Sequence, residues 1–319
     1  MNTPYVSIII PARNAEKTIK KCLDSVLNLD YKNYEVIVID DGSEDRTPEI
    51  LENYKDKIKI IKNIKALGPS QSRNMAVKEA KGEYLAFTDA DCFVDKSWLT
   101  ELISGFKESK IVSVGGIQEI PKDETEFGRK VSEFFKKIGF ISDYMHIAKR
   151  KESVEVNHNP SCNVMYRKDI FLEENGFLEN LWPGEDVELD YRLRKKGYKI
   201  IFNPKAIVYH YRPSNLKSFL KMMYRYGWAQ GFLVKKYGIF RKIQILPFLT
   251  LGIFLCFCIA LFYMNIYLLL FFIFIFLFLI LYFKFDLYIL PVFLSWHYGF
   301  LNGIFFKENN LHKYEDKDD

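Results

Sequence analysis

The sequence predicts an α/β fold, a doubly wound and mostly parallel sheet, followed by an α-helical membrane region. Two observations carry this prediction. Short apolar runs alternate with helical patterns over about the first 120 residues, as expected for strands joined by crossover helices. Nearer the C-terminus lies an almost uncharged stretch, in which 15 of the 28 Phe fall between Phe248 and Phe306. These two patterns together exclude a single soluble domain.

Near-continuous apolar runs predict strands that are covered on both faces, as in a parallel sheet. The runs span residues 6–10, 35–39, 58–61, 84–87 and 111–114. Helical patterns separate them at residues 15–27, 48–54 and 69–80. Further along, we expect a basic aromatic helix at about 124–149, a loop and strand at 157–166, a helix at 184–196, and strands at 199–202 and 206–209.

Acidic residues follow the second and fourth predicted strands. Asp40 and Asp41 come directly after the second strand, and Asp89 and Asp91 follow the fourth. Ligands of open α/β sheets bind beyond the strand C-termini, and residues i and i+2 of an extended backbone face the same way. Two carboxylates facing one site suit Mg²⁺ or Mn²⁺. Either cluster alone could equally be a turn, but the two together favour a binding site.

Three further positions can carry either chemistry or structure. Arg73, near a predicted helix start, suits a diphosphate, although a lone arginine is usually a surface residue. Glu185 and Asp186 open a helix, where a carboxylate either stabilises the N-terminus or acts as a general base. His210 follows a strand and can complete a metal site, although a single histidine is usually structural.

The sequence lacks the motifs of several functional classes, which are therefore disfavoured. The first strand runs into Pro11-Ala12-Arg13-Asn14 rather than GxGxxG, and neither GxxxxGK[ST] nor HExxH occurs. These absences disfavour a dinucleotide fold, a P-loop and a zincin site. The 45 Lys and Arg exceed the 40 Asp and Glu only slightly, for a net charge of +5. That charge does not indicate nucleic-acid binding.

The segment from Lys205 to Lys242 holds nine Lys or Arg and no Asp or Glu. Ser214 is expected to cap a helix in it, with one apolar face formed by residues 216, 219, 220 and 223. This helix is either packed on the domain and solvated, or interfacial on an anionic membrane surface. We favour the second interpretation because an apolar stretch follows at once.

The apolar stretch is long enough for two membrane helices, expected at residues 245–263 and 266–282. A third apolar segment, residues 287–306, contains Pro291 and His297 and either spans the membrane or lies in the interface. Basic residues before the first span place that side in the cytosol. The predicted domain organisation is therefore a catalytic domain, an interfacial helix region, two to three membrane helices and a charged tail, at residues 1–211, 212–242, 243–306 and 307–319.

Taken together, five segments resemble the family 2 inverting glycosyltransferases of GT-A fold. They are Val6–Asn14, Asp40–Ser43, Ser72–Asn74, Asp89–Asp91 and Gly184–Leu189, in the family's order and spacing. The resemblance covers residues 5 to about 211. It implies that the backbone around Pro11, Ala12 and Arg13 and the carboxylate of Asp41 hold a uridine-type base, and that Arg73 contacts the diphosphate.

The resemblance also implies the reacting groups. Asp89 would lie by the ribose and the metal, Asp91 would ligate Mn²⁺ or Mg²⁺ directly, and His210 matches a position that completes the metal site in some members. Asp186 would be the catalytic base. The reaction implied is a single in-line displacement with inversion at the anomeric carbon.

The function implied is that of a membrane-anchored enzyme, multi-pass in the cell membrane with its catalytic domain in the cytosol. It would move a sugar from a nucleotide-diphosphate sugar, such as a UDP-sugar, to a polyprenyl-linked or polysaccharide acceptor. The alternatives are a processive polysaccharide synthase subunit, a nucleotidyltransferase and a catalytically degenerate membrane scaffold. The QxxRW signature of processive synthases is missing, and the nearby text is Tyr191–Lys195.

Overall fold

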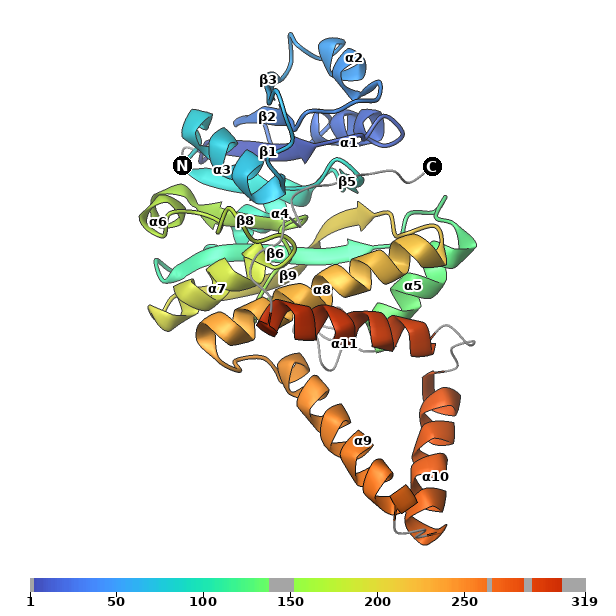
Figure 1. Cartoon of the computed structure of the whole chain (residues 1–319). Helices are drawn as coiled ribbons and strands as arrows, with labels where there is room; N and C mark the ends of the chain where they lie inside the picture. The colour runs from blue at the N-terminus through green and yellow to red at the C-terminus, as the bar shows by residue number, and fades with distance from the viewer. Residues whose placement is uncertain (1–2, 138–151, 263–265, 284–288, 306–319) are drawn as a thin grey trace. The chain divides into compact units, whose positions relative to one another are not determined.

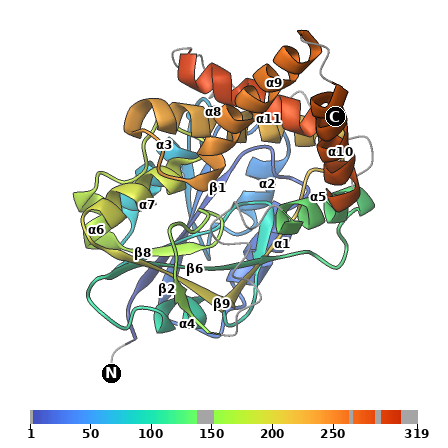
Figure 2. The same cartoon turned by 90° about the horizontal axis from the view of Figure 1, so that it is seen from below.

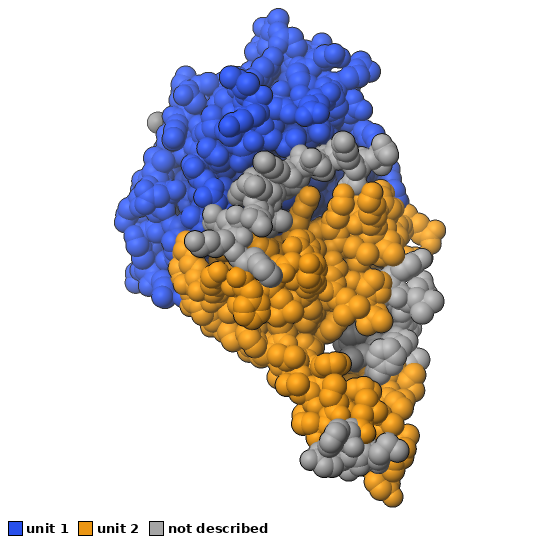
Figure 3. All heavy atoms as spheres, viewed as in Figure 1, with its two compact units in different colours: residues 1–125, 143–212, 310–319 blue, residues 126–142, 213–309 orange. Residues whose placement is uncertain are grey.

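The computed structural model of the chain describes residues 3–137, 152–262, 266–283 and 289–305. Contacts divide the chain into two compact units (Figure 3). The first, here called the sheet unit, comprises residues 1–125, 143–212 and 310–319. The second, the helical unit, comprises residues 126–142 and 213–309. The predicted domain limits at residues 211, 242 and 306 stay a prediction.

The described residues of the sheet unit form one nine-stranded sheet (Figure 1). Its strands are β1 (Val6–Ala12), β2 (Tyr34–Asp40), β3 (Lys59–Lys62), β4 (Tyr84–Phe87), β5 (Cys92–Val94), β6 (Ile111–Glu119), β7 (Val154–Glu155), β8 (Val164–Arg167) and β9 (Lys199–His210). Their order is β3-β2-β1-β4-β8-β6-β9-β5, and β7 also pairs with β9.

The sheet is mixed, which corrects the prediction of a mostly parallel sheet. The pairs β1–β2, β1–β4, β2–β3 and β6–β9 are parallel. The pairs β4–β8, β6–β8, β5–β9 and β7–β9 are antiparallel. Strand β8 is buried like its neighbours β4 and β6, and a fully buried strand has the same apolar composition in either direction. The sequence pattern therefore could not show its direction.

The two strands predicted at residues 199–202 and 206–209 are one strand, β9. Its pairing with β6 shifts register between Gly116, which is opposite Asn203, and Ile117, which is opposite Ile207. A Cβ on Gly116 would lie 1.9 Å from the carbonyl oxygen of Ala206. The strand thus continues through a β-bulge that requires glycine on the partner strand.

Helices cover both faces of the sheet, as predicted for a doubly wound fold. They are α1 (Ile19–Val26), α2 (Thr47–Glu52), α3 (Pro69–Glu79), α4 (Trp98–Ser104), α6 (Lys168–Glu173) and α7 (Glu185–Lys195). Side chains of β1 alternate between the two layers. Ile8 and Ile10 belong to the core formed with α1 and α4, whereas Ile9 belongs to the core formed with α3 and α7.

The helical unit contains α5 (Glu126–Lys137), α8 (Leu216–Tyr237), a 3-10 turn η2 (Lys242–Ile245), α9 (Leu246–Phe262), α10 (Ile266–Phe283) and α11 (Ile289–Phe305). Helix α8 begins one residue later than predicted. Its N-cap is Asn215, whose side chain accepts a hydrogen bond of 3.0 Å from the backbone N–H of Ser218. Ser214 is therefore not the cap.

Helices α8 and α11 lie side by side in both views (Figures 1 and 2). Glycines on each helix allow this approach. A Cβ on Gly227 would lie 1.9 Å from the carbonyl oxygen of Trp296, and one on Gly299 would lie 2.0 Å from that of Tyr224. The glycines four residues further along both helices are equally close to the partner backbone. This spacing is the GxxxG pattern of closely packed helices.

The apolar face of α8 is covered by other helices of the same unit. Phe219 and Met223 are buried in a core with Phe134 of α5 and with Trp296 and Phe300 of α11. For the apolar face, this packing supports the other interpretation, in which the helix is packed on the rest of the protein. That face is not available to a membrane. Membrane binding by the basic face of α8 stays a prediction. The third predicted apolar segment forms α11, which packs on α8.

Helices α9 and α10 contact each other, with the rings of Phe257 and Phe272 at 5.6 Å. They expose large apolar side chains, among them Phe254 (59%) and Phe274 (66%). By length and composition, one described stretch, Lys242–Ile259, could cross a membrane. The predicted break at residues 263–265 lies outside the described residues.

Candidate active site

Asp41 anchors the loop that leads into α3. It directly follows β2, and its backbone N–H donates to the carbonyl oxygen of Ala12 at 2.8 Å. Its buried carboxylate accepts three hydrogen bonds, at 2.7, 2.9 and 2.8 Å, from Asn63 Nδ2 and the backbone N–H groups of Leu67 and Gly68. The structure thus assigns Asp41 a structural role at the expected edge of the sheet, and its contact with a base stays a prediction.

The other residues predicted to hold the donor base lie at the same sheet edge. Pro11 and Ala12 are the last residues of β1, in register with Ile39 and Asp40 of β2. Arg13 follows directly. Because β1 and β2 are parallel, their C-termini meet here, where open α/β sheets bind ligands.

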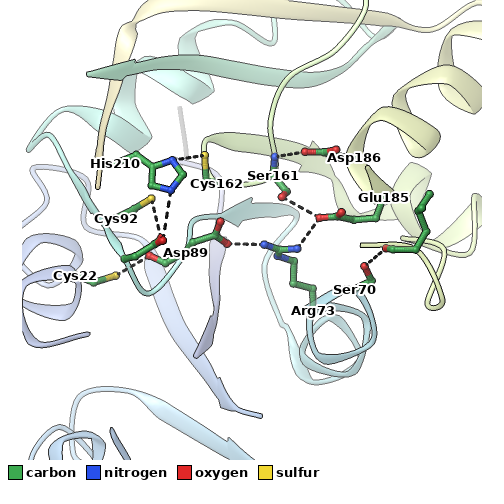
Figure 4. Close-up of polar contacts among 12 residues, drawn as sticks. Cys22, Ser70, Arg73, Asp89, Cys92, Ser161, Cys162, Glu185, Asp186 and His210 are labelled. Carbon is green, nitrogen blue, oxygen red and sulfur yellow. Dashed lines mark hydrogen bonds and ion pairs between the residues drawn. The ribbon is translucent and has the colours of Figure 1, made fainter. Parts of the chain in front are cut away.

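Arg73 is the centre of a buried ionic cluster (Figure 4). It lies on α3 and is only 1% exposed. Its Nη2 donates to Asp89 Oδ1 at 2.5 Å, and its Nη1 donates to Glu185 Oε1 at 2.7 Å. Ser161 Oγ donates to the same Glu185 oxygen at 3.0 Å. We call Arg73, Asp89, Ser161, Glu185 and the adjoining Asp186 the guanidinium cluster.

The sequence allowed two interpretations of Arg73, a surface arginine and a ligand of a diphosphate. The alternative of a surface arginine is wrong, because the guanidinium is buried and paired. Its predicted contact with a diphosphate stays a prediction, which the burial does not favour. The observed pairs instead join α3 to the end of β4 and to the start of α7. Arg73 therefore positions the acidic residues, since buried charges are stable only when they are paired.

The guanidinium cluster carries more negative than positive groups, since the carboxylates of Asp89, Glu185 and Asp186 surround one guanidinium. Burial and the neighbouring Asp186 raise the pKa of Glu185 to about 8, against the opposing attraction of Arg73. Burial opposes the charge on Arg73, but Asp89 and Glu185 outweigh it and raise the arginine pKa. Burial and the excess of negative charge therefore favour proton binding by Glu185, and the ion pair with Arg73 opposes it.

Asp186 lies in the first turn of α7, next to Glu185. Its Oδ2 accepts a hydrogen bond from the backbone N–H of Ser161 at 2.8 Å, and its Oδ1 accepts one from Val187 at 2.7 Å. Gly184, at the N-cap, has φ 101°, a left-handed conformation that favours glycine. Asp186 is partly exposed, whereas the Glu185 side chain is 2% exposed. Only Asp186 of the two can meet a substrate.

A second cluster lies at the end of β9. His210 is paired with Cys92 across β5 and β9. Its Nε2 lies 3.5 Å from Asp91 Oδ2, and its Nδ1 lies 3.9 Å from Cys162 Sγ. Cys92 Sγ donates to Asp91 Oδ1 at 3.6 Å. We call Asp91, Cys92, Cys162 and His210 the thiol cluster (Figure 4).

The thiol cluster contains the two predicted metal ligands, Asp91 and His210. An adjacent carboxylate and imidazole fit a divalent cation. The Asp91 side chain is 51% exposed and His210 is 18% exposed, so an ion bound there could still meet a substrate. Sequence reasoning missed the two thiols, although Cys92 directly follows Asp91 and so belongs to the same strand end.

Charges within the thiol cluster stabilise each other. Burial opposes the charge on His210, but Asp91 outweighs it and raises the pKa of His210 to about 10. The hydrogen bond from Cys92 lowers the pKa of Cys162 to about 6, against the effect of burial, and His210 adds to the lowering. Burial raises the pKa of Cys92, so the two thiols of the cluster differ in acidity.

The loop before β8, residues 158–161, is positioned by Asp190 of α7. This buried carboxylate accepts hydrogen bonds of 2.9 Å each from the Asn159 backbone N–H and the Tyr166 hydroxyl. It also lies 3.1 Å from Nδ1 of His158. No sequence signal indicated Ser161, which bonds to Glu185 and Asp186, because its partners are more than 20 residues away.

Comparisons with known proteins identify the family. The family model of Glycosyl transferase family 2 matches residues 7–173. A dolichyl N-acetyl-alpha-D-glucosaminyl phosphate 3-beta-D-2,3-diacetamido-2,3-dideoxy-beta-D-glucuronosyltransferase of Methanococcus voltae is 29% identical over 267 residues, covering 76% of this chain and 78% of that protein. Glycosyltransferase AglE of Haloferax volcanii is 30% identical over 233 residues, covering 71% and 73%. A poly-beta-1,6-N-acetyl-D-glucosamine synthase of Staphylococcus epidermidis is 28% identical, covering 71% of this chain and 54% of the synthase.

A solved structure shares the fold. Mannosyltransferase PcManGT from Pyrobaculum calidifontis, in complex with GDP-Man and Mn²⁺, has a TM-score of 0.73 at 16% identity. The match covers 96% of this chain and 89% of that one. The resemblance found in the sequence is thereby confirmed in its fold and family. The chain has the GT-A fold and belongs to glycosyl transferase family 2, and it is a glycosyltransferase.

Proposed function

We propose that this chain transfers a sugar, with inversion, from a nucleotide-diphosphate sugar to a hydroxyl of a lipid-linked or polysaccharide acceptor at a membrane. The relatives support the acceptor class, because one acts on a dolichyl-linked sugar and another makes a polymer. The exposed apolar α9 and α10 support membrane anchoring. The structure similar in fold was solved with a GDP-sugar, and for this chain we propose a UDP-sugar.

One observation carries the proposed reaction, namely the partly exposed Asp186 carboxylate held by two backbone N–H groups. A general base must be fixed within reach of the proton that it accepts. Asp186 accepts the proton of the acceptor hydroxyl while that oxygen forms a bond to the anomeric carbon. The bond from the anomeric carbon to the diphosphate breaks in the same displacement, so the configuration inverts.

Asp91 and His210 would hold a divalent cation, Mn²⁺ or Mg²⁺ in our sequence prediction. When bound, such an ion stabilises the negative charge of a leaving diphosphate. The mannosyltransferase of similar fold was solved with Mn²⁺, which supports a divalent metal here. Asp89 is held by Arg73 at the same strand end, and we propose that its remaining oxygen faces the ribose.

We propose single transfers rather than processive synthesis. In the segment Tyr191–Lys195, near the proposed base, Arg192 is used structurally. Its Nε donates to Glu188 Oε2 at 2.9 Å, and its Nη atoms donate to the carbonyl oxygens of Glu174 at 2.6 Å and Gly176 at 2.8 Å. These bonds tie α7 to the loop after α6, and they leave this arginine no evident role toward an acceptor.

The test is turnover of the full chain in detergent micelles with a panel of UDP- and GDP-sugars and a polyprenyl-linked sugar acceptor. We expect release of nucleoside diphosphate that depends on the acceptor and on one nucleotide sugar. Formation of pyrophosphate from a nucleoside triphosphate and a sugar phosphate would instead identify a nucleotidyltransferase. If a folded chain neither turns over nor binds any nucleotide sugar, the scaffold alternative replaces the proposal.

A further inference from the structure

The thiol cluster contains more donors than its predicted role requires. One donor atom each of Cys92, Cys162 and His210 lies within 4.8 Å of the others. Both cysteines are almost fully buried, at 2% and 4% exposed. Asp91 adds a carboxylate, 3.6 Å from Cys92 Sγ and 3.5 Å from His210 Nε2. Two thiols and an imidazole therefore converge on one place, and the carboxylate of Asp91 lies next to two of these three donors.

Separations between adjacent donors are close to those around a bound zinc ion. Zinc bonds of about 2.0–2.1 Å to nitrogen or oxygen and about 2.3 Å to sulfur place neighbouring donors roughly 3.3–3.8 Å apart. In the cluster, Asp91 lies 3.5 Å from His210 Nε2 and 3.6 Å from Cys92 Sγ, and Cys162 Sγ lies 3.9 Å from His210 Nδ1. An ion would take one ring nitrogen of His210, and Nδ1 also lies 3.2 Å from Gln118 Oε1.

The chemical type of the donors also favours zinc, because two of them are thiols. Thiolates are soft ligands that select zinc over magnesium, and any such site binds zinc more tightly than manganese.

We propose that Asp91, Cys92, Cys162 and His210 bind a thiophilic divalent cation, Zn²⁺, in preference to Mn²⁺ or Mg²⁺. This inference rests on the proposed function for two of its four ligands, Asp91 and His210, and it changes the identity of the metal. The thiols come from the start of β5 and from the loop before β8, so the ion would link these two segments at the end of β9.

The test uses the purified full chain in detergent, stripped of metal with a chelator and titrated with Co²⁺ as a spectroscopic probe for Zn²⁺. We expect a thiolate-to-cobalt charge-transfer band that Zn²⁺ abolishes at equimolar amounts and that excess Mn²⁺ leaves in place. Cys92→Ser and Cys162→Ser should each weaken binding by more than the roughly 10–100-fold that loss of a ligand's hydrogen-bond partner costs. Cys256→Ser, at an exposed cysteine of α9, is the matched control and should bind like the wild type.

A second measurement uses the wild-type chain, so it remains valid if the cysteine variants do not fold. In the wild-type chain, Zn²⁺ should slow alkylation of Cys92 and Cys162, mapped by mass spectrometry, without slowing that of Cys256. Absence of the band, or a band that persists in the Cys92→Ser/Cys162→Ser double variant, would overturn the zinc site. Equal protection of all three cysteines would also overturn it.

The metal inference and the proposed function can fail separately. If the band is absent while nucleoside diphosphate release continues with Mn²⁺, the zinc site is wrong and the transferase proposal stands. If the band is present and depends on both cysteines, but no nucleotide sugar turns over, the zinc site stands and the proposed function is wrong.

Discussion

The sheet unit buries charged side chains, whereas the helical unit, over its described residues, buries none. In the sheet unit Arg73, Glu185 and Asp190 are buried, and each is paired or hydrogen-bonded. In the helical unit the buried polar side chains include Gln230 and Gln244, which bond to each other at 3.1 Å. Close packing there depends on glycine rather than on ion pairs.

This difference indicates that the two units have different roles. Burying charge is costly unless partners are provided, so the paired carboxylates of the sheet unit indicate a site where charge is used. The helical unit has its buried core in α5, α8 and α11, and it leaves apolar side chains exposed on α9 and α10. Exposed apolar surface of that extent marks a contact with another apolar phase or partner.

The largest expected effect on stability comes from Arg73→Met. It leaves the buried carboxylate of Glu185 and the partly exposed carboxylate of Asp89 without their cation, which should cost about 3–5 kcal/mol of unfolding free energy. Denaturant unfolding of the full chain in detergent, followed by tryptophan fluorescence, measures it. Arg46→Met is the control, because Arg46 pairs with Glu49 at an exposed site and should cost less than about 1 kcal/mol. Equal losses in both variants would contradict the positioning role.

A charged residue introduced in the middle of α9 tests whether this helix spans a membrane. Phe254 is 59% exposed, and in a membrane-spanning helix Phe254→Lys should raise the apparent insertion free energy by about 2.5–3.5 kcal/mol. Insertion into microsomes, scored by glycosylation of engineered flanking sites, measures this change. Phe254→Leu is the matched control and should insert like the wild type. Unchanged insertion of the Lys variant would rule out a spanning α9.

Smaller effects are expected from the glycines. Gly299→Ala adds a Cβ that meets the backbone of Tyr224 at 2.0 Å, so α8 and α11 must separate. Overpacking of this kind costs about 1–3 kcal/mol, which thermal unfolding should detect as a lowered midpoint. Gly252→Ala, on α9, meets nothing within 4 Å and should not lower it. If Gly252→Ala is as damaging as Gly299→Ala, the close helix contact is not what holds this unit together.

Apolar runs in the sequence predicted the strands, because such runs are local features. The strand β4 was predicted with its observed limits, and the acidic residues after β2 and β4 were found at the sheet edge because apolar runs and their ends are local features. The surroundings of these residues could not be predicted in this way. Arg73 meets Glu185 across 112 positions of the sequence, and the direction of β8 depends on its neighbours in the sheet.

The apolar C-terminal third shows the same limit. Hydropathy identified the helices, but it does not tell whether a helix faces lipid or another helix. For α11 the answer was present in the sequence as GxxxG spacing at Gly299 and Gly303, matched by Gly227 and Gly231 on α8. The GxxxG spacing predicts this helix contact only when the pattern on α8 and the pattern on α11 are considered together.

The most direct test of the central claim compares Asp186→Asn with Glu185→Gln in donor binding and in single-turnover transfer. Asp186 touches neither donor nor metal in this account, so Asp186→Asn should bind both nearly as the wild type does. Its transfer rate should fall by roughly 10²–10⁴-fold through loss of the proton acceptor, while Glu185→Gln, a buried neighbour, should lose less. If Asp186→Asn transfers sugar at the wild-type rate while Glu185→Gln does not, the base has been assigned to the wrong carboxylate and the account is contradicted.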